Sequence, residues 1–112
     1  MAHDFKRRAQ IEDASDSICR NIAEGFGCRS HAEFARYLEI ARRSLNELVD
    51  ALRSARQKGY ISIDEFNTFG KTINRLFPAI NKLIAYLRNR PTPRRARNSP
   101  RRESSRMRKL SP

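Results

Sequence analysis

Long apolar runs are missing from this sequence. The longest, residues 83–87, has five residues, whereas a helix needs about twenty to cross a bilayer, and no N-terminal run resembles a signal peptide. Cysteine is also scarce, because Cys19 and Cys28 are too few for a disulfide framework. These absences exclude a membrane-spanning or disulfide-stapled protein and predict a cytoplasmic one, since free thiols suit a reducing compartment.

Catalytic and metal-binding patterns are equally scarce. No Ser/His/Asp or paired-carboxylate arrangement stands out. The segment Gly25-x-Gly27 lacks the Lys-Ser/Thr of a phosphate-binding loop and follows no predicted strand. Cys28-x-x-His31 offers two metal ligands and Cys19 a third, but structural zinc takes four ligands with paired spacings. We therefore expect neither an enzyme nor a metal or cofactor site.

Basic residues outnumber acidic ones, and the excess lies at one end. The chain carries a net charge of +12, and residues 90–112 hold nine basic residues against the single acid Glu103. The first 89 residues hold fifteen basic and eleven acidic residues, so they are only mildly basic. This imbalance predicts an anionic partner, first nucleic acid and second an acidic membrane surface.

Residues 90–112 also contain four prolines and five serines or threonines. Such a composition cannot bury enough apolar surface to offset the entropy of ordering, so we expect a disordered arm after a helical domain at residues 1–89. Basic side chains bind phosphates by releasing condensed counterions, without sequence preference. The arm residues expected to do so are Arg94, Arg95, Arg97, Arg101, Arg102, Arg106, Arg108 and Lys109. The alternative is a solubilising tail with no dedicated partner.

Apolar periodicity predicts three helices, the first at about residues 4–25. Asp4 is expected to cap its start, and Gly25 and Gly27 to supply the positive φ that helix ends and turns need. Its apolar face is formed by Ile11, Ala14, Ile18 and Ile22.

The second helix is expected at about residues 31–58. Ser30 and Glu33 form a capping box at its start, in which each side chain bonds the other residue's backbone N–H, and Gly59 ends it. Its apolar residues alternate spacings of four and three, the pattern of a seam that packs on another helix. They are Phe34, Leu38, Ala41, Leu45, Leu48, Leu52 and Ala55.

The third helix, at about residues 63–89, repeats this design with a capping box of Ser62 and Glu65. Pro91 is expected to end it, because the residue before proline disfavours the helical region. Inside the helix, Pro78 cannot donate a backbone hydrogen bond, which predicts a kink. Its seam consists of Phe66, Phe69, Ile73, Leu76, Ile80, Leu83 and Leu87.

The predicted fold is an all-α, up-and-down antiparallel bundle of the four-helix type, with three helices in this chain. Apolar residues outside the seams, such as Tyr37, Val49 and Ile84, give the helices the wide stripe of elements with two or more neighbours. Three helices leave part of this surface unmatched. We therefore expect a fourth helix or another subunit to cover it.

Residues 17–48 resemble a known family. They read Ser-Ile-x-x-Asn-Ile-Ala-Glu-Gly-Phe-Gly at 17–27, Glu-Phe-x-Arg-Tyr-Leu-Glu-Ile-Ala at 33–41 and Ser-Leu-x-Glu-Leu at 44–48. This pattern is similar to the bacterial four-helix-bundle family that includes proteins encoded by intervening sequences in 23S ribosomal RNA genes. That family is related in fold to the accessory variability determinant of diversity-generating retroelements. The motif positions carried by this chain are Ser17, Asn21, Glu24, Gly25, Gly27, Ser30 and Glu33.

The resemblance implies a bundle that assembles into rings, pentamers in the better-understood relatives, with basic surfaces that bind nucleic acid. The retroelement relatives also bind a reverse transcriptase, which adds such an enzyme to the expected partners. The family's first helix precedes the segment equivalent to residues 4–24, so that helix is expected to be missing from this chain.

Helix-face arginines extend the predicted basic surface. Arg36 and Arg43 are seven residues apart and lie opposite the second seam. Arg29, Arg42, Arg53 and Arg56 are expected to enlarge that surface. The alternative is an ordinary solvated face, because Glu39 precedes Arg43 by four residues and Asp50 precedes Arg53 by three, the spacings of helix ion pairs.

The sequence therefore predicts a non-enzymatic, oligomeric helical bundle that binds RNA or DNA through phosphate contacts. The alternative is a protein-interaction module that docks a partner on its apolar seams. For Asn21 and Glu24 we expect a structural role, with hydrogen bonds to the turn backbone at residues 25–27 or to the start of the next helix.

Overall fold

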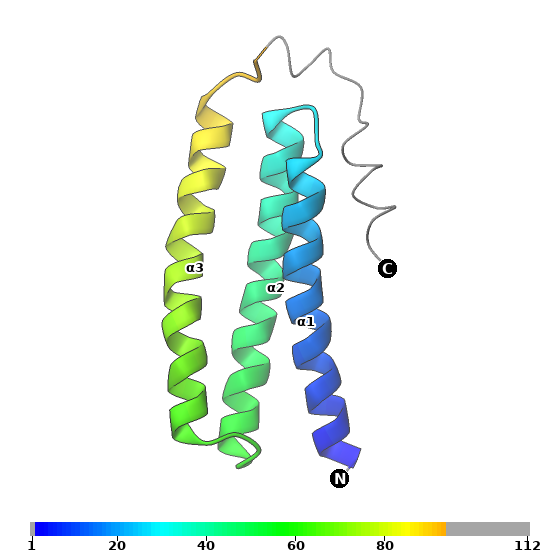
Figure 1. The fold of residues 1–112 in the computed structure, drawn as a ribbon, viewed down its shortest axis with the longest axis vertical. Helices are drawn as coiled ribbons and strands as arrows, with labels where there is room; N and C mark the ends of the chain where they lie inside the picture. The colour runs from blue at the N-terminus through cyan, green and yellow to red at the C-terminus, as the bar shows by residue number, and fades with distance from the viewer. Residues whose placement is uncertain (1, 94–112) are drawn as a thin grey trace.

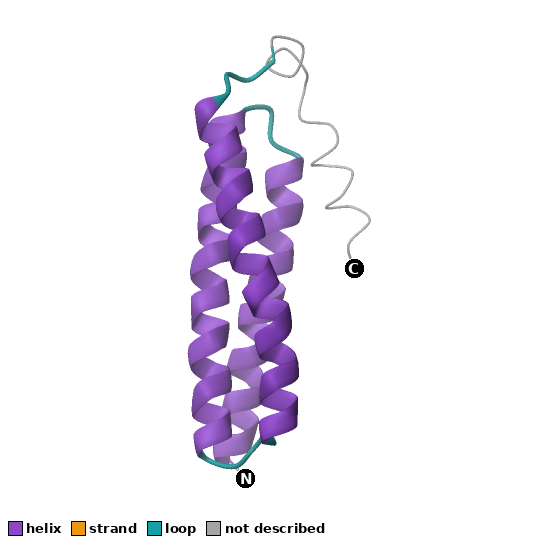
Figure 2. Ribbon diagram, turned by 90° about the vertical axis from the view of Figure 1, so that its left-hand side faces the viewer, coloured by secondary structure: helices purple, strands orange, loops and turns teal. Residues whose placement is uncertain are grey.

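The computed structural model describes residues 2–93, which form three helices: α1 (Ala2–Phe26), α2 (His31–Gln57) and α3 (Ile63–Asn89). Consecutive helices run antiparallel and are joined by short turns, and the described part contains no strand (Figure 1, Figure 2). The all-helical prediction is confirmed, with helix bounds within two residues of those expected.

The N-caps predicted for α2 and α3 are present, and the reciprocal box expected at both helices is confirmed for α3. The Ser30 hydroxyl accepts the backbone N–H of Glu33 at 3.1 Å at the start of α2. At α3 the box is reciprocal, because Ser62 accepts the Glu65 N–H and the Glu65 carboxylate accepts the Ser62 N–H, both at 3.0 Å. Each cap satisfies amide groups that the first turn of a helix leaves without partners.

The end of α2 is a Schellman motif built on Gly59, which has a φ of 77°. The N–H of Gly59 donates to the carbonyl of Arg56 at 3.0 Å, and the N–H of Tyr60 donates to that of Ala55 at 2.9 Å. Glycine adopts this left-handed conformation without the clash that a Cβ would cause. The prediction for Gly59 is confirmed.

The predictions for the two ends of α1 are wrong in detail. The helix begins at Ala2, so Asp4 lies inside its first turn and not at the cap. Neither Gly25 nor Gly27 has a positive φ, because Gly59 is the one such residue in the described part. The need for a glycine at position 25 comes instead from close packing, since a Cβ there would lie 2.6 Å from Cδ1 of Phe34.

Helix α3 continues through Pro78, which is exposed, so the chain does not break there. The predicted kink stays a prediction. The helix ends at Asn89, and Arg90, which precedes Pro91, is extended with φ −129° and ψ 129°. The stop at Pro91 is confirmed.

Helix α2 is the centre of the fold, because α1 and α3 both pack on it. Its seam residues Leu38, Leu45 and Leu52 are at most 1% exposed. Removing each from water contributes about 1.5–3 kcal/mol. Buried residues from the flanking helices complete the core, and these are Ala14, Ile18, Ile73, Ile80, Ile84 and Leu87.

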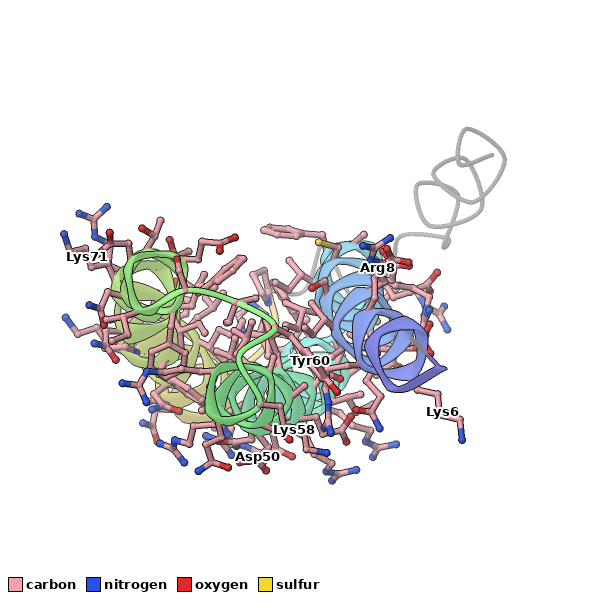
Figure 3. The ribbon with its side chains drawn as sticks, turned by 90° about the horizontal axis from the view of Figure 1, so that it is seen from below. Lys6, Arg8, Asp50, Lys58, Tyr60 and Lys71 are labelled. Atoms are coloured by element: carbon pink, nitrogen blue, oxygen red, sulfur yellow. The ribbon has the colours of Figure 1, made fainter. Side chains whose placement is uncertain are left out.

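Helices α1 and α3 diverge on the two sides of α2, as the end-on view shows (Figure 3). No Cα atom of α1 lies within 8 Å of one in α3. The apolar seam of α3 is therefore only partly buried. Phe69 is 44% exposed, and Leu76 and Leu83 are half-buried. The structure thus has an opening between α1 and α3, with α2 as its floor.

Candidate nucleic-acid interface

The arginines predicted on the helix faces are accessible. Arg36, Arg43 and Arg53 lie exposed along α2, and Arg29 lies exposed in the turn that precedes it. Within the described residues, none of these four forms an ion pair. The helix pairs that would have neutralised Arg43 and Arg53 are therefore not formed there.

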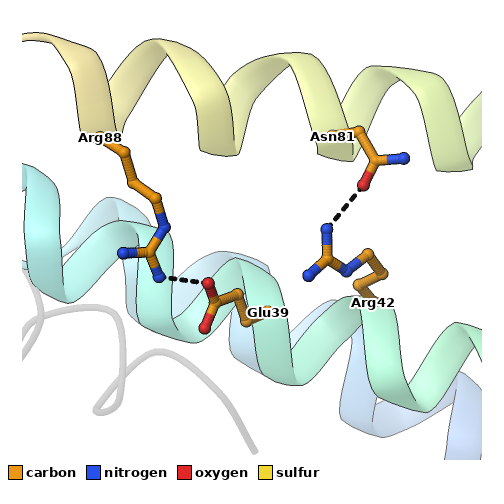
Figure 4. Close-up of polar contacts among 4 residues, drawn as sticks. All are labelled: Glu39, Arg42, Asn81 and Arg88. Atoms are coloured by element: carbon orange, nitrogen blue, oxygen red, sulfur yellow. Dashed lines mark hydrogen bonds and ion pairs between the residues drawn. The ribbon is translucent and has the colours of Figure 1, made fainter.

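Glu39 pairs across the bundle instead of along its own helix. Its carboxylate bonds Arg88 of α3, and Arg42 donates to the side-chain oxygen of Asn81 at 2.8 Å (Figure 4). These two links tie α2 to α3 on an exposed surface, where an ion pair contributes about 1 kcal/mol or less. Arg42 and Arg88 are thereby committed to the contact between helices.

The outer face of α3 carries basic residues that the sequence analysis missed. Lys71, Arg75 and Lys82 are all exposed, and no acidic residue occurs between Phe66 and Arg102. This acid-free run could have predicted a basic face on α3 from the sequence, because it spans most of that helix and the start of the arm. Beyond the first turn of α3, which holds Asp64 and Glu65, no acid on this helix opposes the charge of this face.

A groove between α2 and α3 is lined by one arginine that the sequence predicted and by one lysine that it did not. Arg53 and Lys71 both line it, and its volume is about 1200 Å³. Its walls also carry Asn46, Asp50 and Asp64 among other residues. The two acids lower the local positive potential, so the strongest cationic surface lies farther along α3.

The basic residues predicted in the arm, from Arg94 to Lys109, lie outside the described residues 2–93. The described chain ends just before them, at the C-terminal end of α3 (Figure 1). Because Arg90 and the arm follow α3 without an intervening acid, the basic face of the helix and the arm are continuous in sequence.

Residues 1–82 match the family described as 23S rRNA-intervening sequence protein. The chain belongs to this family. The predicted family is thereby confirmed, while the relation to the retroelement protein stays a prediction. The curated proteins and the solved structures provide no match.

In this 23S rRNA-intervening sequence protein, the family motif builds the contact between α1 and α2. The Ser17 and Ser44 hydroxyl oxygens lie 2.6 Å apart, in hydrogen-bond contact. Asn21, which is 8% exposed, donates from Nδ2 to the Ser17 carbonyl at 2.7 Å. Its bond therefore runs back along α1 and not to the turn, contrary to the prediction.

The turn itself is closed by backbone groups. The carbonyl of Glu24 accepts the N–H of Gly27 at 3.1 Å, and that of Gly25 accepts the N–H of Cys28 at 3.1 Å. The Cys28 thiol also donates to the Glu24 carbonyl at 3.4 Å. These contacts give the motif a structural role, as expected, although through different atoms.

No group of three or more His, Cys, Asp or Glu side chains in the described part of the chain gathers closely enough to hold a metal ion. No helix there combines the length and the apolar character needed to cross a membrane.

The opening between α1 and α3 is a second candidate surface. At the end marked by the α2–α3 turn it holds a cavity of about 600 Å³, lined by Ile11 from α1, by Tyr60 and Ile61 from the turn and by Glu65 from α3. Along α3, the half-exposed stripe of Phe69, Leu76 and Leu83 continues it. A surface of this kind is suited to an apolar partner.

Proposed function

We propose that this protein is a non-enzymatic RNA-binding member of the 23S rRNA-intervening sequence family, acting in the cytoplasm. The observation that carries the proposal is the set of exposed cations Lys71, Arg75 and Lys82 on α3, within a sequence run that holds no acid from Phe66 to Arg102. The family's description refers to ribosomal RNA, which favours RNA over DNA as the first ligand to test.

Binding through this surface is driven by phosphate contacts. Each lysine or arginine that meets a phosphate releases condensed counterions, so affinity falls steeply as salt rises. Arginine adds two parallel hydrogen bonds to phosphate oxygens. Arg36 and Arg43 supply additional contacts from α2, since no ion pair in the described part engages them.

The test compares the full chain with a variant that ends after Pro93. This end point keeps Thr92, whose hydroxyl accepts the His31 N–H at 2.9 Å. We expect the shortened protein to bind RNA more weakly and with a smaller salt dependence, measured by fluorescence anisotropy over a salt series. Unchanged affinity and unchanged slope would refute the role of the arm.

We further propose that the bundle is completed by self-association, with part of a second copy in the fourth-helix position between α1 and α3. Support comes from the half-exposed seam of α3 and from the absence of contact between α1 and α3. The family resemblance implies a pentamer. Light scattering on the purified chain measures the mass directly.

The alternative function is a protein-interaction module that docks a different protein, such as a reverse transcriptase, in the same opening. The observation in its favour is again the exposed apolar stripe of α3. A soluble monomer that binds RNA no more tightly than a generic basic protein would favour this alternative. A closed oligomer with salt-dependent RNA binding would refute it.

A further inference from the structure

Helix α3 ends and α2 begins at the same end of the molecule (Figure 1). There the chain brings an aromatic ring, an imidazole and a guanidinium together. The ring is Tyr86, the imidazole is His31 and the guanidinium is Arg90. His31 and Tyr86 are far apart in sequence, so only the antiparallel packing of α2 and α3 places them side by side. We name this group the Tyr86 corner.

Two hydrogen bonds hold His31 of the Tyr86 corner against the segment that ends α3. The N–H of His31 donates to the Thr92 hydroxyl at 2.9 Å, and Nδ1 of His31 lies 3.0 Å from the Arg90 carbonyl oxygen. A carbonyl only accepts hydrogen bonds, so Nδ1 carries the proton of this contact. Nε2, the other ring nitrogen, forms no hydrogen bond with the described part of the chain.

Tyr86 is held beside two polar groups and yet remains accessible. The centroid of the Tyr86 ring lies 6.3 Å from the centroid of the His31 ring. The guanidinium carbon of Arg90 lies 4.8 Å from the Tyr86 centroid. The residue is 50% exposed, while its neighbours Ile84 and Leu87 are buried in the core. The core therefore fixes the backbone beneath Tyr86. The Arg90 guanidinium lies over one face of the ring, and half of the residue remains open to solvent.

We propose that the Tyr86 corner binds an unpaired nucleotide of RNA, with the base stacked on Tyr86 and the adjacent phosphate bound by Arg90. This inference rests on the proposed function and names the kind of RNA that the site takes. A paired base hides its faces inside the helix, so only an unpaired base can stack on a protein ring.

The chemistry of the corner matches that of single-strand binding sites. Such sites combine an aromatic side chain, on which any base can stack, with cations that follow the backbone. Arg90 provides a cation within reach of the ring, and Arg94, the first arginine of the arm, follows it by four residues.

The structure also supplies a matched control. Tyr60 is 39% exposed and lies in the turn between α2 and α3, at the opposite end of the bundle (Figure 3). No aromatic or cation contact joins its ring to another described residue. A nonspecific effect of losing an exposed tyrosine would appear equally at both positions.

The experiment uses the full chain and two RNA ligands, an unstructured single strand of about 12 nucleotides and a blunt duplex of the same length. Affinities of the wild type, Tyr86→Leu, Tyr86→Phe and Tyr60→Leu are measured across a salt series. We expect Tyr86→Leu to weaken single-strand binding about tenfold or more, since one stacked base is lost. Duplex binding and the salt slope should not change, because no phosphate contact is removed.

The two control variants sharpen the reading. Tyr86→Phe keeps the ring and should retain most of the affinity. Tyr60 lines the cavity between α1 and α3, so Tyr60→Leu serves as the control once light scattering gives it the wild-type mass, and it should then bind both ligands as the wild type does. The proposal is overturned if Tyr86→Leu leaves single-strand affinity unchanged or weakens both ligands equally. It is also overturned if the variant alters the oligomeric mass, which would place Tyr86 in a subunit contact. Loss of salt-dependent binding in the wild type would instead refute the proposed function.

Discussion

Helix α2 is joined to its two neighbours by different means. Against α1 the contact adds small and polar residues to apolar ones such as Ile18, with Gly25 close to the Phe34 ring and Ser17 bonded to Ser44. Against α3 it uses large apolar side chains and exposed links such as that from Glu39 to Arg88. The difference separates two roles, because the family motif serves the first interface, whereas the exposed cations Lys71, Arg75 and Lys82 lie on the outer face of α3.

The sharpest test of this division neutralises the outer face of α3. The triple variant Lys71→Gln, Arg75→Gln and Lys82→Gln removes three exposed cations. We expect RNA affinity to fall about tenfold to a hundredfold at moderate salt, and the salt slope to fall by about two, because three counterion-releasing contacts are lost. Filter binding over a salt series measures both, and an unchanged melting temperature confirms that the fold is intact.

The opposite result is expected for Gly25→Ala at the α1–α2 interface. The new Cβ would stand 2.6 Å from the Phe34 ring, so packing must shift. We expect a loss of about 1–3 kcal/mol in the free energy of unfolding, the usual cost of overpacking, with RNA affinity per folded molecule unchanged. Urea denaturation provides the measurement. Adding Phe34→Leu should recover part of the loss, and failure to do so would argue against this clash.

Neutralising α2 should have a smaller effect on RNA binding than neutralising α3. The matched triple variant Arg36→Gln, Arg43→Gln and Arg53→Gln also removes three exposed cations, but Glu47 and Asp50 lie on the same helix and are exposed. We expect affinity to fall about threefold or less, because nearby acids already weaken phosphate contact. Equal losses in the two triple variants would remove the distinction between the helices.

The smallest effect is expected for Glu39→Gln, which breaks the exposed pair with Arg88. Stability should fall by about 0.5–1 kcal/mol or less, since surface ion pairs contribute little. RNA affinity should rise slightly, because Arg88 becomes available to a phosphate. Thermal denaturation and anisotropy measure the two quantities, and Gln57→Glu, which adds an acid elsewhere on α2, provides the contrasting variant.

The sequence predicted the helices well because their signals are local. Capping residues such as Ser30 and Ser62 act within one turn, and Gly59 and Pro91 stop helices through their own backbone preferences. The error at Gly25 has a physical cause. Sequence suggests that glycine supplies unusual dihedral angles, whereas here it supplies space for a ring from the next helix.

The candidate interface was predicted only in part. Arg36 and Arg43 were identified by their helical spacing, and their exposure is confirmed. The alternative reading, in which Glu39 pairs with Arg43 along α2, is not what the structure has, because the packed bundle offers Arg88 from α3. Lys71, Arg75 and Lys82 were missed because each is unremarkable alone, although the acid-free run around them was visible.

By itself the sequence determined the three helices, their boundaries, the basic arm and the family, since each depends on neighbouring residues or on a local motif. Only the tertiary structure decided which charges are paired, that α1 and α3 stay apart, and that Tyr86 meets His31 and Arg90. These features depend on contacts between residues distant in sequence, and no local periodicity encodes which side chains such packing brings together.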